Sequence, residues 1–122
     1  MADVFQWASS AAVQGVYLIQ DPMFLSNRFA IARHAEMNRL PLVAGASSFV
    51  HAGALAAYGL DNLRIARECG SYIARILRGA DLAELPIQQP SRFLLASNLK
   101  TATELGLTIP PVLLARADEV IE

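Results

Sequence analysis

The first group of residues in this chain that could do chemistry lies in the short stretch 21–27. Asp21, Ser26 and Asn27 supply a carboxylate, a hydroxyl and an amide within seven residues. Such a set suits the amino group or the polar edge of a small solute. A structural explanation is equally good, because Asp before Pro favours a turn and Ser-Asn before a helix favours a cap. The stretch therefore predicts a loop that either binds a solute or only starts the following helix.

A second candidate stretch, residues 58–62, begins with Tyr58 and Gly59. The tyrosine ring could stack on a ligand or could complete a core strand. Both stretches follow predicted strands, and open parallel sheets bind their ligands beyond the carboxyl ends of strands. Tyr58 and Gly59 thus join the first three residues as the candidate ligand-binding set.

Catalytic and metal chemistry have little support. His34 and His51 stand alone, outside any paired ligand spacing such as H-x-x-x-H, so we expect exposed or locally bonded histidines and no metal. Cys69, the one cysteine, lies on the apolar stripe of a predicted helix and is expected to be an inert core residue. The stretches offer no carboxylate pair and no Ser/His/Asp set, so we expect a binding module with no catalytic residue and no cofactor.

A phosphate site is the main alternative. Gly45-Ala46-Ser47-Ser48 lies between a predicted strand and a predicted helix, where backbone amides and hydroxyls can hold an anion. The turn matches neither of the glycine-rich phosphate-binding motifs, which favours an ordinary capped turn. A small doubly wound anion- or nucleotide-binding protein or enzyme therefore stays open.

The elements that must position these residues follow an alternating β/α pattern. Short apolar runs alternate with segments of helical period, and nearly every run or segment ends at a turn-forming residue such as Gly or Pro. The pattern predicts helices over 2–12, 28–38, 49–52, 62–77, 98–105 and 110–117, and strands over 15–19, 42–44, 55–58 and 93–96. Strands joined through helices indicate a three-layer α/β fold, with a mostly parallel sheet and helices on both faces.

Length and composition place this pattern in one α/β domain over residues 1–122. The chain has 54% hydrophobic residues and a formal net charge of -1, so no basic field exists to gather nucleic acid. The longest apolar runs are too short to span a membrane. The mean hydropathy of +0.36 is high for so short a chain, which indicates apolar surface that serves either a partner or a missing piece.

The C-terminal third carries a family resemblance. The relevant run begins at Leu77-Arg78-Gly79-Ala80-Asp81-Leu82 and continues through Pro90-Ser91-Arg92-Phe93 and Ser97-Asn98-Leu99-Lys100. This run resembles the end of ABC transporter substrate-binding proteins of the type I periplasmic-binding fold. Three upstream segments are similar to further motifs of that family. They are Asp21-Pro22-Met23-Phe24-Leu25-Ser26-Asn27-Arg28, Arg39-Leu40-Pro41 and Ala57-Tyr58-Gly59.

The resemblance implies one lobe of a two-lobed protein that closes on a small solute, such as an amino acid, and delivers it to an ABC permease. Asp21, Ser26, Asn27, Tyr58 and Gly59 would line the cleft. Because a first lobe and an export signal have no counterpart here, we expect a truncated binding protein, cytoplasmic as written and extracytoplasmic if it derives from an exported precursor. We further expect a homodimer, with exchanged segments as one form of it, that covers the apolar stripe of helix 62–77. A purely structural dimer with a vestigial cleft stays open.

Overall fold

The protein forms two compact units in a computed structural model that describes residues 2–122, without the side chain of Ala2. One unit comprises Met1–Gly59 and Leu94–Glu122, and the other comprises Leu60–Phe93. The prediction of a single domain over 1–122 stays a prediction.

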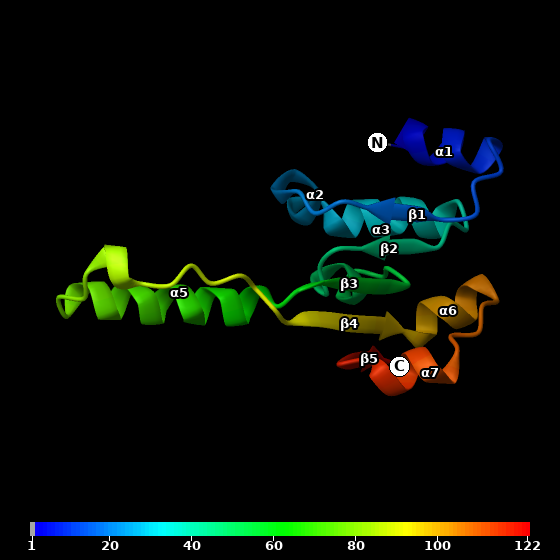
Figure 1. The fold of residues 1–122 in the computed structure, drawn as a ribbon. Helices are drawn as coiled ribbons and strands as arrows, with labels where there is room; N and C mark the ends of the chain where they lie inside the picture. Colours follow the sequence, from blue (N-terminus) through cyan, green and yellow to red (C-terminus); the bar gives the residue numbers. More distant parts are fainter. Residues whose placement is uncertain (1) are drawn as a thin grey trace. The chain divides into compact units, whose positions relative to one another are not determined.

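A five-stranded sheet in the order β1-β2-β3-β4-β5 organises the first unit (Figure 1). β1 to β3 are parallel, with Val16 beside Leu42 and Ala44 beside Ala57, and β5 is parallel to β4. The Asn98 amide donates to the Leu55 carbonyl at 2.9 Å, and the Asp61 amide to the Arg92 carbonyl at 3.2 Å, so β4 runs opposite to β3. The strands are β1 (Val16–Leu18), β2 (Leu42–Ala44), β3 (Ala56–Leu60), β4 (Phe93–Asn98) and β5 (Glu119–Ile121).

Helices of the first unit begin and end at residues that suit those positions. Asn98 caps α6 through a bond from the Thr101 amide, and Gly106, at φ 70°, ends it in the left-handed conformation that glycine adopts without strain. Pro111 begins α7, where its missing amide hydrogen costs nothing. The helices are α1 (Ala2–Ser10), α2 (Pro22–Ser26), α3 (Arg28–Met37), α4 (Ser48–His51), α6 (Leu99–Leu105) and α7 (Pro111–Arg116).

The core lies on one face of β1 and β2. Phe5 and Ala8 from α1, with Ile31 and Ala35 from α3, form a buried cluster against which Val16 and Leu18 of β1 pack. A second buried group joins α4 to the far strands through Val50, Ala57 and Ala96. The predicted α/β class and the mostly parallel sheet are therefore confirmed.

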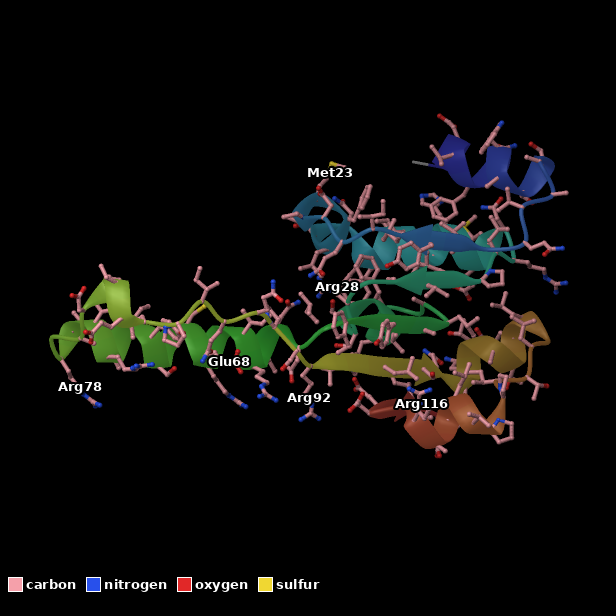
Figure 2. All side chains as sticks on the ribbon, viewed as in Figure 1. Met23, Arg28, Glu68, Arg78, Arg92 and Arg116 are labelled. Carbon is pink, nitrogen blue, oxygen red and sulfur yellow. The ribbon has the colours of Figure 1, made fainter. Side chains whose placement is uncertain are left out.

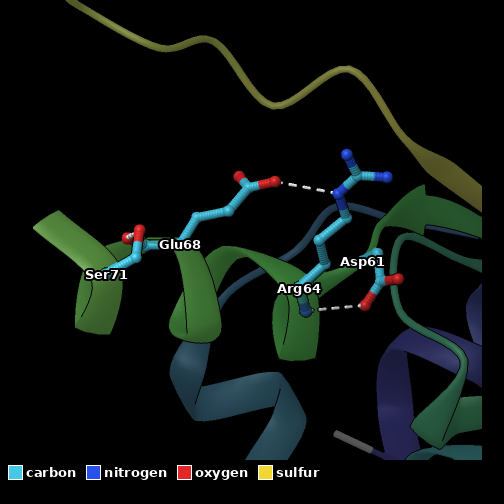
Figure 3. A network of polar contacts seen from close by, with 4 residues as sticks. All are labelled: Asp61, Arg64, Glu68 and Ser71. Atoms are coloured by element: carbon cyan, nitrogen blue, oxygen red, sulfur yellow. Dashed lines mark hydrogen bonds and ion pairs between the residues drawn. The ribbon is translucent and has the colours of Figure 1, made fainter.

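The second unit consists of helix α5 (Asn62–Leu77), a single 3-10 turn (Leu82–Glu84) and an extended segment that runs back alongside the helix in Figure 1. Asp61 caps α5 by accepting from the Arg64 amide at 3.0 Å (Figure 3). Tyr72 fastens the returning segment by donating to the Pro86 carbonyl. None of the sixteen residues of α5 is buried. Within residues 2–122 we find no helix that is both long and apolar enough to cross a membrane.

The polar face of α5 carries a local network. Arg64 Nε donates to Glu68 Oε1 at 2.8 Å, and Ser71 Oγ donates to the Glu68 carbonyl at 2.7 Å (Figure 3). The hydrogen bond to Glu68, more than its charge, raises the pKa of Arg64 above the ordinary value. Because both side chains are well exposed, this ion pair contributes little to stability. Glu68 also lines the hollow between α5 and the returning segment, so the network borders the apolar side chains of the helix.

Several sequence-based predictions about the elements were wrong in detail. Residues 22–26, predicted as a loop, form α2. Gly59, predicted to close the third strand, lies inside β3, and β4 extends two residues beyond the prediction. β5 was missed, because three residues of strand carry no readable period. Cys69, predicted to be buried, is exposed.

Candidate functional site

The carboxyl ends of β1, β2 and β3 meet at one edge of the sheet because these strands are parallel. Their backbones pack tightly there. A Cβ placed on Gly59 would lie 1.7 Å from the Gly45 carbonyl oxygen, and one on Gly45 would lie 3.3 Å from Cβ of Gln20. Position 59 therefore requires glycine, and the contact brings it to the same edge as Gln20 and the adjoining Asp21.

Asp21 stands at the start of α2. Its carboxylate accepts a hydrogen bond from the Met23 amide at 2.7 Å, and Pro22 occupies the first helical position. The residue is thus the N-cap of a short helix, which is why the predicted loop is helical. Its exposed carboxylate has a second oxygen that can accept from a solute.

Ser26 and Asn27 lie at the other end of α2. Ser26 Oγ donates to the Pro22 carbonyl at 3.0 Å, and Asn27 Nδ2 donates to the Met23 carbonyl at 2.8 Å. Asn27 is also the residue before α3, yet its side chain does not cap that helix. These bonds use the Ser26 hydroxyl hydrogen and one of the two Asn27 Nδ2 hydrogens, and they leave the hydroxyl lone pairs and Asn27 Oδ1 as acceptors, which match an ammonium group.

Tyr58 on β3 and Phe29 on α3 carry exposed aromatic rings. Tyr58 is 56% exposed, in contrast to the alternative in which it completes the core. On α3, the Arg28 guanidinium lies 4.6 Å from the centre of the exposed Phe29 ring. Figure 2 labels Arg28 beyond the end of α2 and Met23 in its first turn. Residues 21–29 and Tyr58 thus carry acceptors, a cation and exposed rings, the groups that suit an amino acid with a large side chain.

The Gly45–Ser48 turn, which is the alternative anion site, packs largely against the rest of the chain. Gly45 and Ala46 are buried, and Ser47 precedes α4 without a capping bond from its side chain. With Gly59 against the Gly45 carbonyl, the turn supports the sheet edge. A helix of four residues also offers little dipole for an anion.

A hollow of about 540 Å³ lies elsewhere. Its walls include Leu42 at the start of β2 and Asn98 and Ile121 at the ends of β4 and β5, so it opens at the opposite edge of the sheet. Positive and negative side chains are mixed around it, among them Glu36, Arg39, His51, Lys100 and Glu104. Sequence analysis missed this group, because its members come from separate helices and form no motif.

The two histidines have local partners, as predicted. His51 Nε2 lies 2.8 Å from Glu119 Oε1 in an exposed pair, and the His34 ring stacks on Phe5 with the ring centres 6.0 Å apart.

Comparison with known proteins gives the family. The sequence model of the family described as "ABC transporter substrate binding protein" matches residues 3–121. Among characterised proteins, a tyrosine-binding protein from Clostridioides difficile strain R20291 is 25% identical over 72 residues, which are 59% of this chain and 21% of that protein.

Two solved structures are similar over 98% of this chain. One is an ABC domain in complex with L-Trp from Streptococcus pneumoniae, 28% identical with a TM-score of 0.87 over 40% of that chain. The other is a conserved domain protein from Vibrio cholerae, 30% identical with a TM-score of 0.82 over 41% of that chain. The present chain thus spans about two fifths of the length of each.

Proposed function

The chain belongs to the family of ABC transporter substrate-binding proteins, and from this premise we propose that it binds one aromatic amino acid without changing it chemically. The family match over residues 3–121 carries the proposal. Relatives described as binding tyrosine and as bound to L-Trp indicate the class of solute. Both relatives are distant in sequence, and the polar and aromatic groups of the candidate site support the same class of solute.

The edge formed by β1 to β3 is the proposed binding surface. The amino group of the solute would lie against the Asp21 carboxylate, with Ser26 Oγ and Asn27 Oδ1 as further acceptors. Its ring would stack on Tyr58, whose exposure makes the ring accessible. Gly59 would leave room at the edge by having no side chain, and a Cβ at this position would overlap the Gly45 carbonyl oxygen.

Binding to one wall of a cleft is expected to be weak, so the test needs a method that detects millimolar affinities. In ¹⁵N-labelled protein, L-Trp and L-Tyr should shift the amide signals of residues 20–29, 45 and 58–59, and indole without the amino acid group should do so less. Shifts confined to residues 45–48 on adding phosphate would favour the anion-binding alternative. No shift with any of these probes would favour a vestigial cleft.

The proposed partners follow from the family. A small solute is the first, and an ABC permease is a partner where a complete two-lobed protein exists, on the extracytoplasmic side of the membrane. We also propose that this chain forms a homodimer, with exchanged segments as one form of it, because α5 buries no residue within the chain.

A further inference from the structure

The hollow of about 540 Å³, at the edge of the sheet opposite the proposed binding surface, has the composition of a ligand site. All of its lining residues belong to the first unit. Its buried lining is mainly aliphatic, and Ala35, Leu40 and Leu42 are only 2%, 6% and 2% exposed. Sites for drug-sized molecules have this size and combine an apolar lining with a few polar groups.

Charged side chains of both signs line this hollow from two elements. Glu36 in the last turn of α3 and Arg39 just after that helix form one pair, and Lys100 and Glu104 of α6 form the other. The spacing of each pair allows an ion pair along the chain, yet none of the four takes part in one within the described residues 2–122. All four are exposed, so a cation and an anion on each element are available to a ligand.

The backbone at Arg39 is unusual for an arginine. Its φ is 52°, in the left-handed region that glycine adopts most readily. The Arg39 amide donates to the Glu36 carbonyl and the Leu40 amide to the Ala35 carbonyl, both at 2.9 Å, an arrangement that commonly ends a helix at glycine. Arginine is unfavourable here for the backbone, which is explained if its guanidinium acts at the hollow.

Two polar residues of the lining suit the peptide group. Asn98 donates one Nδ2 hydrogen to the Val50 carbonyl and keeps a second, which can donate to a peptide carbonyl. Thr101 Oγ1 donates to the Gly53 carbonyl and keeps lone pairs, which can accept from a peptide amide. A single amino acid has no peptide group between its two charges, so it would leave these two residues unused.

We infer that this hollow is a second solute site and that its ligand is a short aliphatic peptide with free termini. The peptide carboxylate would pair with Arg39 or Lys100, and the terminal ammonium group would lie against Glu36 or Glu104. Its aliphatic side chains would contact the buried apolar lining. The site shares no residue with the one proposed for an aromatic amino acid, so either proposal can fail alone.

Titration of the ¹⁵N-labelled protein with the tripeptide Ala-Leu-Ala tests the inference. We expect the amide signals of residues 36–42, 51–53 and 98–105 to shift, and those of residues 20–29 and 58–59 to stay. The same peptide with an acetylated N-terminus and an amidated C-terminus should bind at least tenfold more weakly, because both terminal charges are removed. An absence of shifts around the hollow, or equal binding of the two peptides, would overturn the inference.

The variant Arg39→Gly separates binding from folding. Glycine favours the left-handed backbone, so this variant should unfold at about the same temperature as the wild type or higher, while its affinity for Ala-Leu-Ala falls at least tenfold. Arg33→Gln is the matched control, because it removes the same charge from α3 at a residue outside the hollow, and it should bind like the wild type. Wild-type affinity in Arg39→Gly, or an equal loss in both variants, would contradict the assigned site.

Discussion

Two glycines in the chain have opposite structural requirements. Gly59 faces the Gly45 carbonyl so closely that a Cβ would overlap it, whereas a Cβ on Gly70 would meet open space. Sequence alone does not separate them, since both stand beside or within apolar segments. The difference arises from which backbone the sheet brings next to Gly59.

We expect Gly59→Ala to lower the free energy of unfolding by about 3 kcal/mol or more, because β2 and β3 would have to separate. Gly70→Ala should instead raise the stability of α5 by about 1 kcal/mol through helix propensity. Urea unfolding followed by circular dichroism measures both changes. A Gly59→Ala protein as stable as the wild type would contradict the packing at the sheet edge.

Asp21 combines a structural role with a proposed binding role, and two substitutions separate them. Asp21→Ala removes the cap of α2 and should cost about 1 kcal/mol of unfolding free energy, whereas Asp21→Ser retains a capping oxygen and should cost much less. Both should reduce the L-Trp-induced amide shifts, because both remove the carboxylate. Wild-type shifts in Asp21→Ser would limit Asp21 to capping.

At the scale of elements, one buried amide connects α4, β4 and α6. Asn98 is 6% exposed, donates from Nδ2 to the Val50 carbonyl at 3.1 Å and accepts at Oδ1 from the Thr101 amide at 3.0 Å. Thr101 Oγ1 adds a bond to the Gly53 carbonyl at 3.1 Å. These bonds hold α6 against the segment that follows α4.

Asn98→Leu should lower the free energy of unfolding by about 2 kcal/mol, because the Thr101 amide loses its capping acceptor and the Val50 carbonyl keeps only the bond from the Gly53 amide. Thr103→Ala, which removes a bond to the Leu99 carbonyl on the exposed side of α6, should change it by less than about 0.5 kcal/mol. Thermal unfolding of both proteins provides the comparison. Equal losses would mean that Asn98 adds nothing beyond a surface bond.

At the scale of the whole molecule, the two units differ in how much they bury. The first contains both core clusters, whereas α5 in the second buries no residue. Local opening is governed by such differences, since amides protected by few apolar contacts exchange through low-energy openings.

We therefore expect amide hydrogen exchange in α5 to be at least a hundredfold faster than at Ala44 or Ala57 when the protein is dilute. Protection of α5 should rise with protein concentration if a second copy covers this helix in the proposed homodimer, whereas protection of β2 and β3 should change little. Exchange followed by NMR at two concentrations checks this. Equal protection of the amides in α5 and in β2 and β3 at low protein concentration would contradict the expectation that α5 opens more easily.

The sequence by itself determined the α/β class, the bounds of most helices and the family. These follow from local information: apolar period, caps such as Asp61 and Asn98, and punctuation by Gly and Pro. It also indicated the residues of the candidate site, since Asp21 and Tyr58 each adjoin a recognisable strand. The short strand β5 and helix α2 could not be predicted, because a few residues of regular structure depend on their neighbours in space.

Only the tertiary structure decided which side chains are exposed and which backbones touch. Whether Cys69 is buried depends on what packs against α5, and the described residues 2–122 leave every side chain of that helix at least partly exposed. The need for glycine at position 59 depends on the Gly45 carbonyl, fourteen residues away, that strand pairing places beside it. Burial and close approach are relations between distant segments, so they follow from packing and not from local pattern.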